Sequence, residues 1–290
     1  MNIEEINKGI VIKNIQNFHP IHTFECGQCF RWNKTDDNTY IGVVRDKVIE
    51  VELRGVDLYI YNISQEEFYH RWQDYFDLAR DYSIIQEKLK IDPILKRAID
   101  YGRGIRILNQ DPWETLISFI ISSNKNIPHI KKIIEYLSRS YGSMLIYKGK
   151  EYYTFPTPKQ LSGLSIEEIS KSKCGYRAKF IHAAVERVSN GDINLDYISS
   201  LSSHQTREGL ISLYGVGPKI ADCVMLFSMG KYEVFPTDVW IKRLMEYFYF
   251  KKPTSIKEIR KFANKKWGNL AGFAQQYLFY YGRSHGEIFK

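Results

Sequence analysis

One lysine of this sequence is placed where its side chain could act as a nucleophile. Lys219 follows Gly217 and Pro218, and a proline in this position is typical of the first turn of a helix. The positive end of the helix dipole disfavours a second positive charge, and burial would add to this effect, so we expect a lowered pKa for Lys219. A neutral lysine amine can attack an electrophilic carbon. The alternative is an ordinary lysine in contact with solvent.

A carboxylate, Asp238, occurs nineteen residues after this lysine in a second helix-start pattern. Pro236 and Thr237 precede it, and an ionised carboxylate is stabilised at a helix N-terminus. It could support an oxocarbenium-like sugar or direct a proton transfer, and the alternative is a helix cap with no part in chemistry. Asp222 competes for the same role, but we expect it to pair with a basic side chain or with the backbone.

The segment around the lysine predicts a helix-hairpin-helix at about residues 204–229. Gly215 and Gly217 permit positive φ angles and a close approach of the backbone, and the amides that open the second helix can bind a phosphate. A hairpin of this kind holds a DNA backbone without reading the base sequence. Two other interpretations stay open: the turn could merely join two core helices, or its backbone could also hold a cation.

The elements that must position these residues divide into two predicted domains, residues 1–105 and 106–290. In the first, Thr39–Val44, Lys47–Leu53 and Asp57–Tyr61 are strand-like runs with hairpin-length gaps, which predicts an antiparallel sheet. In the second, apolar residues recur at helical spacing, so we expect an all-α domain and an α+β fold overall. Its clearest helices are expected at Ala178–Val188, Ser203–Tyr214, Pro218–Met229, Asp238–Tyr249, Ser255–Trp267 and Ala271–Gly282.

Charge and composition restrict the class of partner. The 290 residues carry 41 Lys and Arg against 33 Asp and Glu, and the charge of +8 favours a polyanion such as DNA. No apolar run reaches the length of a membrane-spanning helix, and the first residues lack the pattern of a secretory signal, so we expect no membrane partner. Four cysteines fit a reducing compartment, and Cys26-x-x-Cys29 lacks the second pair that a metal site needs, so we expect no metal.

Two spaced motifs carry a resemblance to a known family. The signature of the helix-hairpin-helix DNA glycosylase superfamily resembles two segments of this chain, Gly215–Lys219 and then Pro236–Asp238. Further segments narrow the resemblance to the 8-oxoguanine DNA glycosylases that also have lyase activity. These segments are Gly27–Trp32, Ser122–Ile127, Gly175–Ala178 and Ala274-Gln275, and together they span nearly the whole chain.

The resemblance implies a reaction, a partner and two catalytic residues. The partner is double-stranded DNA that contains 8-oxoguanine, whose nucleotide is flipped out of the duplex because its sugar carbon cannot be reached in the stack. Lys219 attacks C1′, expels the base and forms a Schiff base, and β-elimination of the 3′ phosphate then nicks the strand. Asp238 supports the transition state. The resemblance implies no organic cofactor.

The resemblance also assigns four residues to the damaged base. The backbone carbonyl of Gly27 accepts a hydrogen bond from N7–H, which 8-oxoguanine has and guanine lacks. Gln275 reads the Watson–Crick edge, and Phe279 and Cys223 lie against the two faces of the ring. From the sequence alone these are equally a turn glycine, a polar helix residue and two core side chains.

Four further residues are assigned to the opposite strand and the vacated stack. Asn124 and Arg177 match residues that contact the orphaned cytosine, and Tyr176 matches the wedge that fills the gap. His129 stands where the family commonly has an arginine that reads this cytosine. Lys125 replaces the middle asparagine of a family motif and could contact a phosphate.

Other classes of protein stay open as alternatives. A monofunctional alkylpurine DNA glycosylase would have no need of Lys219, and a non-catalytic helix-hairpin-helix protein would bind DNA without turnover. The related endonuclease III branch carries a four-cysteine iron–sulfur loop near its C-terminus, and the sequence has no cysteine after Cys223. We expect a monomer in the cytoplasm, associated with the nucleoid. The many Lys, Ile, Asn and Tyr residues indicate an AT-rich genome, so we expect a bacterial source.

The histidine at position 129 leads to the first testable prediction. An imidazole is shorter than a guanidinium and mostly neutral at pH 7, so we expect weak discrimination among the bases opposite the lesion. Cleavage rates on four lesion duplexes, each with a different opposite base, measure this directly. A strong preference for cytosine would contradict the prediction.

Overall fold

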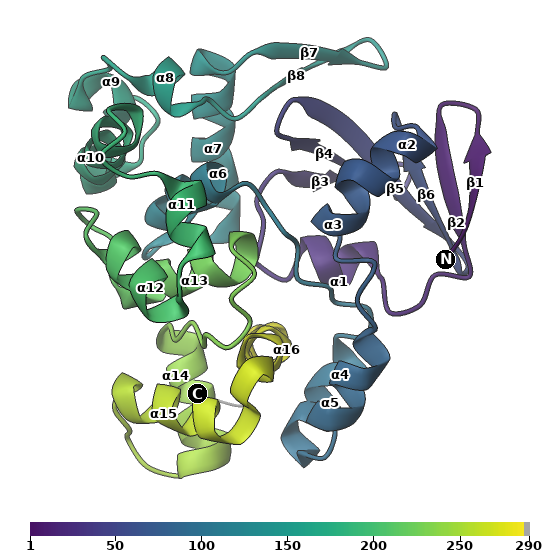
Figure 1. Cartoon of the computed structure of the whole chain (residues 1–290), viewed down its shortest axis with the longest axis vertical. Helices are drawn as coiled ribbons and strands as arrows, with labels where there is room; N and C mark the ends of the chain where they lie inside the picture. The colour runs from purple at the N-terminus through teal and green to yellow at the C-terminus, as the bar shows by residue number, and fades with distance from the viewer. Residues whose placement is uncertain (287–290) are drawn as a thin grey trace.

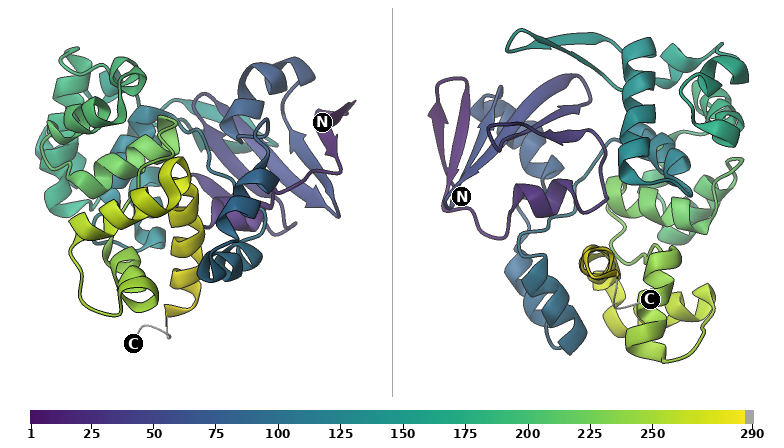
Figure 2. Two further views of the ribbon diagram at one scale, coloured as in Figure 1. Left: turned by 60° about the horizontal axis from the view of Figure 1, so that its bottom comes forward. Right: turned by 180° about the vertical axis from the view of Figure 1, so that it is seen from behind.

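The chain folds into a sheet-containing N-terminal part and a mostly helical remainder, as the computed structural model of residues 1–286 shows (Figure 1). This confirms the predicted α+β class. Seen from behind, the sheet lies beside the helices α6–α13, and α14–α16 lie below them (Figure 2). Among the described residues, no helix is both long and apolar enough to span a membrane.

The N-terminal sheet has six strands, all antiparallel, in the order β1-β2-β6-β5-β4-β3. The three predicted strands are confirmed as β4, β5 and β6, and the other three strands were not predicted. Apolar residues at alternate positions of β2, β5 and β6 form the core of the sheet with Trp72 and Phe76. The strands are β1 Asn2–Ile6, β2 Gly9–Lys13, β3 Trp32–Lys34, β4 Tyr40–Val44, β5 Lys47–Arg54 and β6 Asp57–Tyr61.

Short helices connect the sheet to the helical part. α1 (Pro20–Phe24) lies between β2 and β3, and the loop that follows it begins at Glu25. Two helices inside residues 1–105, α4 (Tyr82–Leu89) and α5 (Pro93–Tyr101), contribute Tyr82, Leu89 and Ile99 to the helical core rather than to the sheet core. The segment after β6 forms α2 (Gln65–Glu67), a π-helical turn η1 (Phe68–Trp72) and α3 (Gln73–Tyr75).

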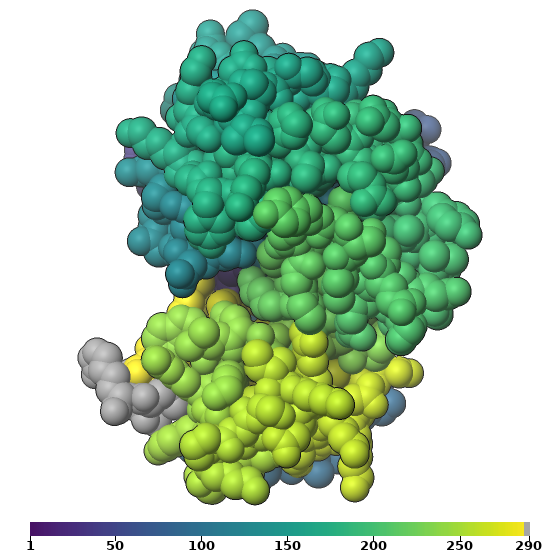
Figure 3. All heavy atoms as spheres, turned by 90° about the vertical axis from the view of Figure 1, so that its left-hand side faces the viewer, coloured from purple at the N-terminus to yellow at the C-terminus, as the bar shows by residue number. Residues whose placement is uncertain are grey.

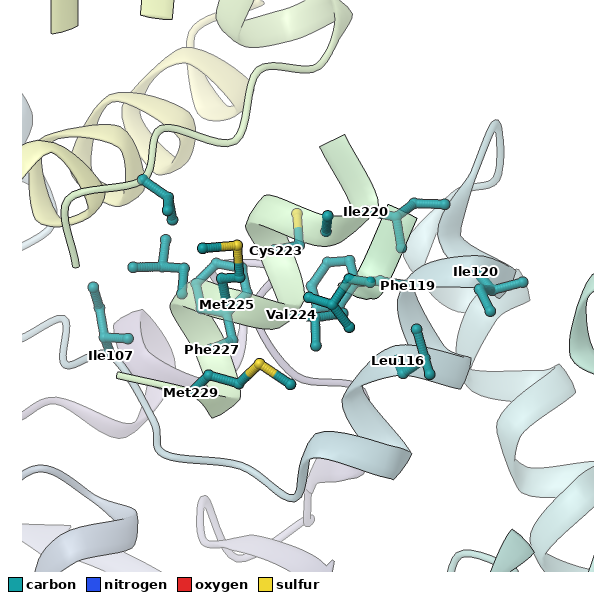
Figure 4. Packing of buried hydrophobic residues seen from close by; sticks show 14 of the residues in the cluster. Ile107, Leu116, Phe119, Ile120, Ile220, Cys223, Val224, Met225, Phe227 and Met229 are labelled. Carbon is teal, nitrogen blue, oxygen red and sulfur yellow. The ribbon is translucent and has the colours of Figure 1, made fainter. Parts of the chain in front are cut away.

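The helices of the remainder begin and end close to the predicted positions. Side chains of α6 and α13, among them Phe119 and Val224, interlock in the centre of this part (Figure 4). The helices are α6 Pro112–Ser122, α7 Ile127–Tyr141, α8 Pro158–Leu161, α9 Ile166–Ser170, η2 Gly175–Arg177, α10 Ala178–Ser189, α11 Leu195–Ser200, α12 Ser203–Ile211, α13 Pro218–Ser228, α14 Val239–Met245, η3 Glu246–Phe250, α15 Ile256–Trp267, η4 Gly268–Leu270 and α16 Ala271–Ser284.

A β-hairpin interrupts these helices, so the expectation of an all-α second domain was wrong. β7 (Met144–Tyr147) and β8 (Lys150–Tyr153) are joined by Lys148 and Gly149, whose φ angles of +50° and +72° are typical of a tight hairpin turn. The hairpin extends toward the sheet (Figures 1 and 2). Four-residue strands carry little periodic signal, and this pair is stabilised by contacts with a distant part of the chain.

Those contacts converge on one buried carboxylate of the sheet. Glu50 in β5 accepts hydrogen bonds from Lys148 Nζ at 2.6 Å, from the Tyr147 hydroxyl at 2.9 Å and from Thr39 Oγ1 at 2.8 Å. Burial opposes ionisation, but these three donors outweigh it and lower the pKa of Glu50. The hairpin is therefore bound to the sheet by an ionised carboxylate.

A second buried carboxylate joins three helices of the remainder. Asp222 in α13 is fully buried and pairs with Arg207 of α12 at 2.8 Å and with Arg260 of α15 at 2.5 Å. This confirms the expected pairing with basic side chains. Asp222 therefore has a structural role and does not compete with Asp238 for a role in chemistry.

We expect replacement of Asp222 by alanine to lower the free energy of unfolding by about 3–5 kcal/mol, because two arginines then lose their buried partner. Urea denaturation of both proteins measures the difference. Glu135→Ala is the matched control, since it removes an exposed ion pair with Arg139 at 2.7 Å and should change stability by at most about 1 kcal/mol. Equal effects of the two substitutions would contradict the prediction.

Candidate active site

A cavity of about 720 Å³ opens where the sheet part and the helical part meet. Its mouth is the hollow between the α6–α13 region and the α14–α15 region, with N-terminal atoms and α16 at its base (Figure 3). The volume is typical of a ligand-binding pocket. The cavity is lined by all six residues predicted to act on the nucleotide, namely Gly27, Lys219, Cys223, Asp238, Gln275 and Phe279.

Lys219 extends from the first turn of α13 into this cavity. Gly217 is the N-cap of the helix and Pro218 its first residue, as predicted. The Lys219 amine lies 3.4 Å from Ser122 Oγ and 5.1 Å from the centre of the Phe119 ring, and the side chain is only partly exposed. It is therefore not an ordinary surface lysine, and no carboxylate among residues 1–286 forms an ion pair with it.

Asp238 reaches the same cavity from a different element. It is the N-cap of α14, and its Oδ1 accepts a hydrogen bond from the backbone N–H of Ile241 at 2.8 Å. The cap fixes the position of the carboxylate at the N-terminus of α14. Helix capping and a place in the cavity therefore occur together in this residue.

The loop after α1 brings Gly27 to the opposite side of the cavity. Its φ is +89°, and a Cβ added there would lie 3.0 Å from Cε1 of Phe279. The backbone conformation strongly favours glycine, and a side chain there would also press against the ring. Phe279 in α16 therefore packs directly on the backbone of this loop.

Gln275 and Cys223 give the cavity one polar and one apolar surface. Gln275 is 5% exposed, and its Oε1 is buried without a hydrogen-bond partner among the described residues. A buried amide oxygen without a donor is unfavourable, which sets Gln275 apart from the other side-chain acceptors that line the cavity. Burial raises the pKa of Cys223 to about 12 against the opposing effect of Lys219, so the thiol is neutral.

The residues predicted for the opposite strand lie outside the cavity. Asn124 is exposed between α6 and α7, with a φ of +58°, and Tyr176 is exposed in η2. Arg177 is buried, and its guanidinium donates hydrogen bonds to the carbonyls of Ser123 and Cys174 while it covers the Tyr176 ring. Arg177 therefore supports the loop that presents Asn124.

His129 lies in the first turn of α7, which begins at Ile127 with Asn126 as its cap. Its ring nitrogens are 3.4 and 3.5 Å from Lys125 Nζ. Partial desolvation together with the charges of Lys125 and Lys132 lowers the pKa of His129. This direction agrees with the neutral imidazole assumed in the sequence analysis.

The two glycines of the hairpin before Lys219 have different backbone conformations. Gly215 has a φ of +84°, and an added Cβ would lie 2.2 Å from Cγ of Phe180, so it matches the prediction. Gly217 has a φ of −91°, and nothing lies within 4 Å of an added Cβ. Gly217 does not use the positive φ that glycine permits: it is an extended N-cap, and its backbone faces open space.

The cavity also contains residues that the sequence did not reveal. Lys131, Gln276 and Arg283 line it, and none of the three belongs to a motif with local spacing. No group of three or more His, Cys, Asp or Glu side chains within residues 1–286 is arranged to hold a metal ion, and the four cysteines are free thiols.

A helix-hairpin-helix that brings a lysine and an aspartate to one deep cavity defines a DNA glycosylase of the helix-hairpin-helix class. Residues 117–269 match the family model of the HhH-GPD superfamily of base excision DNA repair proteins, and residues 10–116 match the N-terminal domain of 8-oxoguanine DNA glycosylase. Within that superfamily, the chain belongs to the 8-oxoguanine DNA glycosylase family.

Three relatives illustrate this membership. The 8-oxoguanine glycosylase/lyase of Clostridium acetobutylicum, solved with double-stranded DNA containing cytosine opposite 8-oxoG, is 48% identical, with a TM-score of 0.97 over 99% of each chain. MBOgg1, solved with a low-affinity DNA ligand, is 52% identical, with a TM-score of 0.96 over 98% of this chain and 99% of that one. N-glycosylase/DNA lyase OGG1 of Arabidopsis thaliana is 31% identical, covering 89% of this chain and 75% of its own.

Proposed function

We propose that this protein excises 8-oxoguanine from double-stranded DNA and then cleaves the strand at the resulting abasic site, as a bifunctional N-glycosylase/DNA lyase of base excision repair. One observation carries the proposal: Lys219, Asp238 and Gly27 come from three separate elements and line one cavity. The Lys219 amine is needed for the covalent step, and the Asp238 carboxylate is needed to stabilise positive charge. The loop that carries Gly27 is needed to recognise the base.

Lys219 is the nucleophile of the proposed reaction. Its amine attacks C1′ of the flipped nucleotide, and the bond between C1′ and the base breaks with its electron pair leaving on the base, which takes up a proton. The amine nitrogen then forms a Schiff base with C1′ as the sugar ring opens. Removal of a C2′ proton expels the 3′ phosphate and cleaves the strand. The carboxylate of Asp238 stabilises the positive charge that develops on the sugar.

Base recognition follows from the polar groups around the cavity. The Gly27 carbonyl accepts the N7–H of 8-oxoguanine and repels the N7 lone pair of guanine, so one oxygen separates lesion from normal base. The unpaired Oε1 of Gln275 suits the N–H donors on the Watson–Crick edge. The neutral Cys223 thiol and the Phe279 ring provide apolar surfaces for the two faces of the base.

The remaining predicted residues act on the DNA outside the cavity. The exposed Tyr176 fills the stack that the nucleotide leaves, and Asn124 contacts the orphaned base. The amides beside Gly215 and Gly217 hold a backbone phosphate, and the same hairpin is suited to a cation bound by its backbone.

The proposed substrate and the relatives of the chain indicate where in the cell the protein acts. We place it in the bacterial cytoplasm, associated with the nucleoid, because genomic DNA is found there and the relative from Clostridium acetobutylicum is bacterial. One chain supplies every group that the reaction uses, which supports a monomer. We keep the proposed boundary between the two domains near residue 105, after α5, although α4 and α5 pack in the helical core.

Borohydride trapping tests the assignment of Lys219. The wild-type protein should form a covalent adduct with an 8-oxoguanine duplex in the presence of borohydride, because the reagent reduces the Schiff base. Lys219→Gln should form none, since it lacks the amine. Release of free base without an adduct by the wild-type protein would indicate a monofunctional glycosylase, and binding without turnover would indicate a non-catalytic DNA-binding protein.

Asp238→Asn separates charge from helix capping. Asparagine caps a helix as well as aspartate does, so the melting temperature should stay close to that of the wild-type protein. Single-turnover excision should fall by about 10²–10³-fold, because the developing positive charge loses its stabilising partner. Excision at the wild-type rate by a folded Asp238→Asn protein would exclude the carboxylate charge from the mechanism.

A further inference from the structure

The loop that carries Gly27 is held by side chains of α16. The Glu25 carbonyl accepts a hydrogen bond from Arg283 Nη2 at 2.8 Å. The Cys26 carbonyl accepts one from Gln276 Nε2 at 3.1 Å, a contact between residues 250 positions apart. Gln276 is 1% exposed, so this bond is protected from water. Two successive carbonyls before Gly27 are therefore fixed by one helix.

The residue after Gly27 is held from another direction. The Gln28 carbonyl accepts a hydrogen bond from Gln110 Nε2 at 2.8 Å. The fully buried side chain of Gln28 donates to the carbonyls of Thr23 at 2.8 Å and Arg106 at 2.7 Å. The loop is thus fixed on both sides of Gly27.

Of the four successive carbonyls from residue 25 to residue 28, only that of Gly27 accepts no hydrogen bond from residues 1–286. Its orientation cannot come from its own residue, because a glycine at positive φ has wide conformational freedom. The neighbouring peptide groups must supply it. Rotation of the peptide between Cys26 and Gly27 would change the direction of the next carbonyl, and the bond from Gln276 opposes that rotation.

One face of α16 combines these contacts with base recognition. Gln275 lines the cavity, the adjacent Gln276 binds the loop, and Phe279, one turn later, packs on Gly27. Arg283 continues the same face after one further turn. The helix therefore keeps the two polar groups that would recognise the base at a fixed separation.

We propose that Gln276 is a positioning residue for lesion recognition: it binds the Cys26 carbonyl and thereby directs the Gly27 carbonyl toward the damaged base. This inference rests on the proposed function, because it takes 8-oxoguanine as the occupant of the cavity. Arg283 supports the same arrangement from the Glu25 carbonyl.

Two activities of one variant test the proposal. Gln276→Leu keeps the side-chain volume and removes the donor. Excision of 8-oxoguanine should fall by about 10–100-fold, since a small displacement of a recognition group is costly. β-Elimination at a preformed abasic site should be unchanged, because no base is present there to be recognised. Gln86→Leu is the matched control: it removes a buried hydrogen bond to Tyr277 of α16, 3.1 Å long, and should leave both activities unchanged.

The results of this experiment distinguish a failure of the role proposed for Gln276 from a failure of the proposed glycosylase function. Wild-type excision by Gln276→Leu, or an equal loss of both activities, would overturn the positioning role. If Gln276→Leu fails to fold, Arg283→Met replaces it, because Arg283 lies at the less buried end of the same helix face. This variant should show the same selective loss of 8-oxoguanine excision. Excision at the wild-type rate by Arg283→Met would then overturn the proposal. Abasic-site cleavage without 8-oxoguanine excision by the wild-type protein would contradict both the proposed substrate and this assignment.

Discussion

The burial of α13 is the constraint on which the site depends. Every residue from Ile220 to Phe227 is buried, so this helix cannot rotate about its axis without exposing apolar surface. Lys219 is the residue directly before this buried run, and the rest of the helix therefore fixes the direction of its side chain. The one carboxylate within the run, Asp222, is satisfied by two arginines from neighbouring helices. A rigid apolar helix with a lysine at its first turn places an amine at the cavity wall, beside Ser122 Oγ and the Phe119 ring.

The other groups of the site reach the cavity by different physical means. Asp238 is placed by helix capping, and Gly27 by a loop whose neighbouring carbonyls are bound by distant side chains. Gln275 and Phe279 share one face of α16. The cavity therefore belongs to neither the sheet nor the helices alone, and its shape depends on how the two parts pack.

Features that depend on residues close together in the sequence, such as helix starts and strand alternation, could be predicted. Pro218 and Pro236-Thr237-Asp238 mark helix starts, and alternation in Lys47–Leu53 marks a strand, so these features were found at nearly the observed positions. The hairpin β7–β8 was missed because its strands are short and its stability comes from Glu50, about a hundred residues earlier in the chain. Gln276 and Arg283 were missed for the same reason, since nothing in their spacing indicates a contact with residues 25 and 26. Placing six predicted residues on one cavity required the family resemblance, because spacing alone does not bring Gly27 near Lys219.

The bond between Glu50 and the β7–β8 hairpin has a mechanical consequence. It ties the sheet to the helical part at a point remote from α1 and α16, so the two parts are joined on more than one side (Figure 1). Contacts on two sides oppose a movement of one part relative to the other. In the proposed reaction, the distortion that brings a nucleotide into the cavity would then fall mainly on the DNA, and DNA sequences that kink at low energetic cost would be entered most readily.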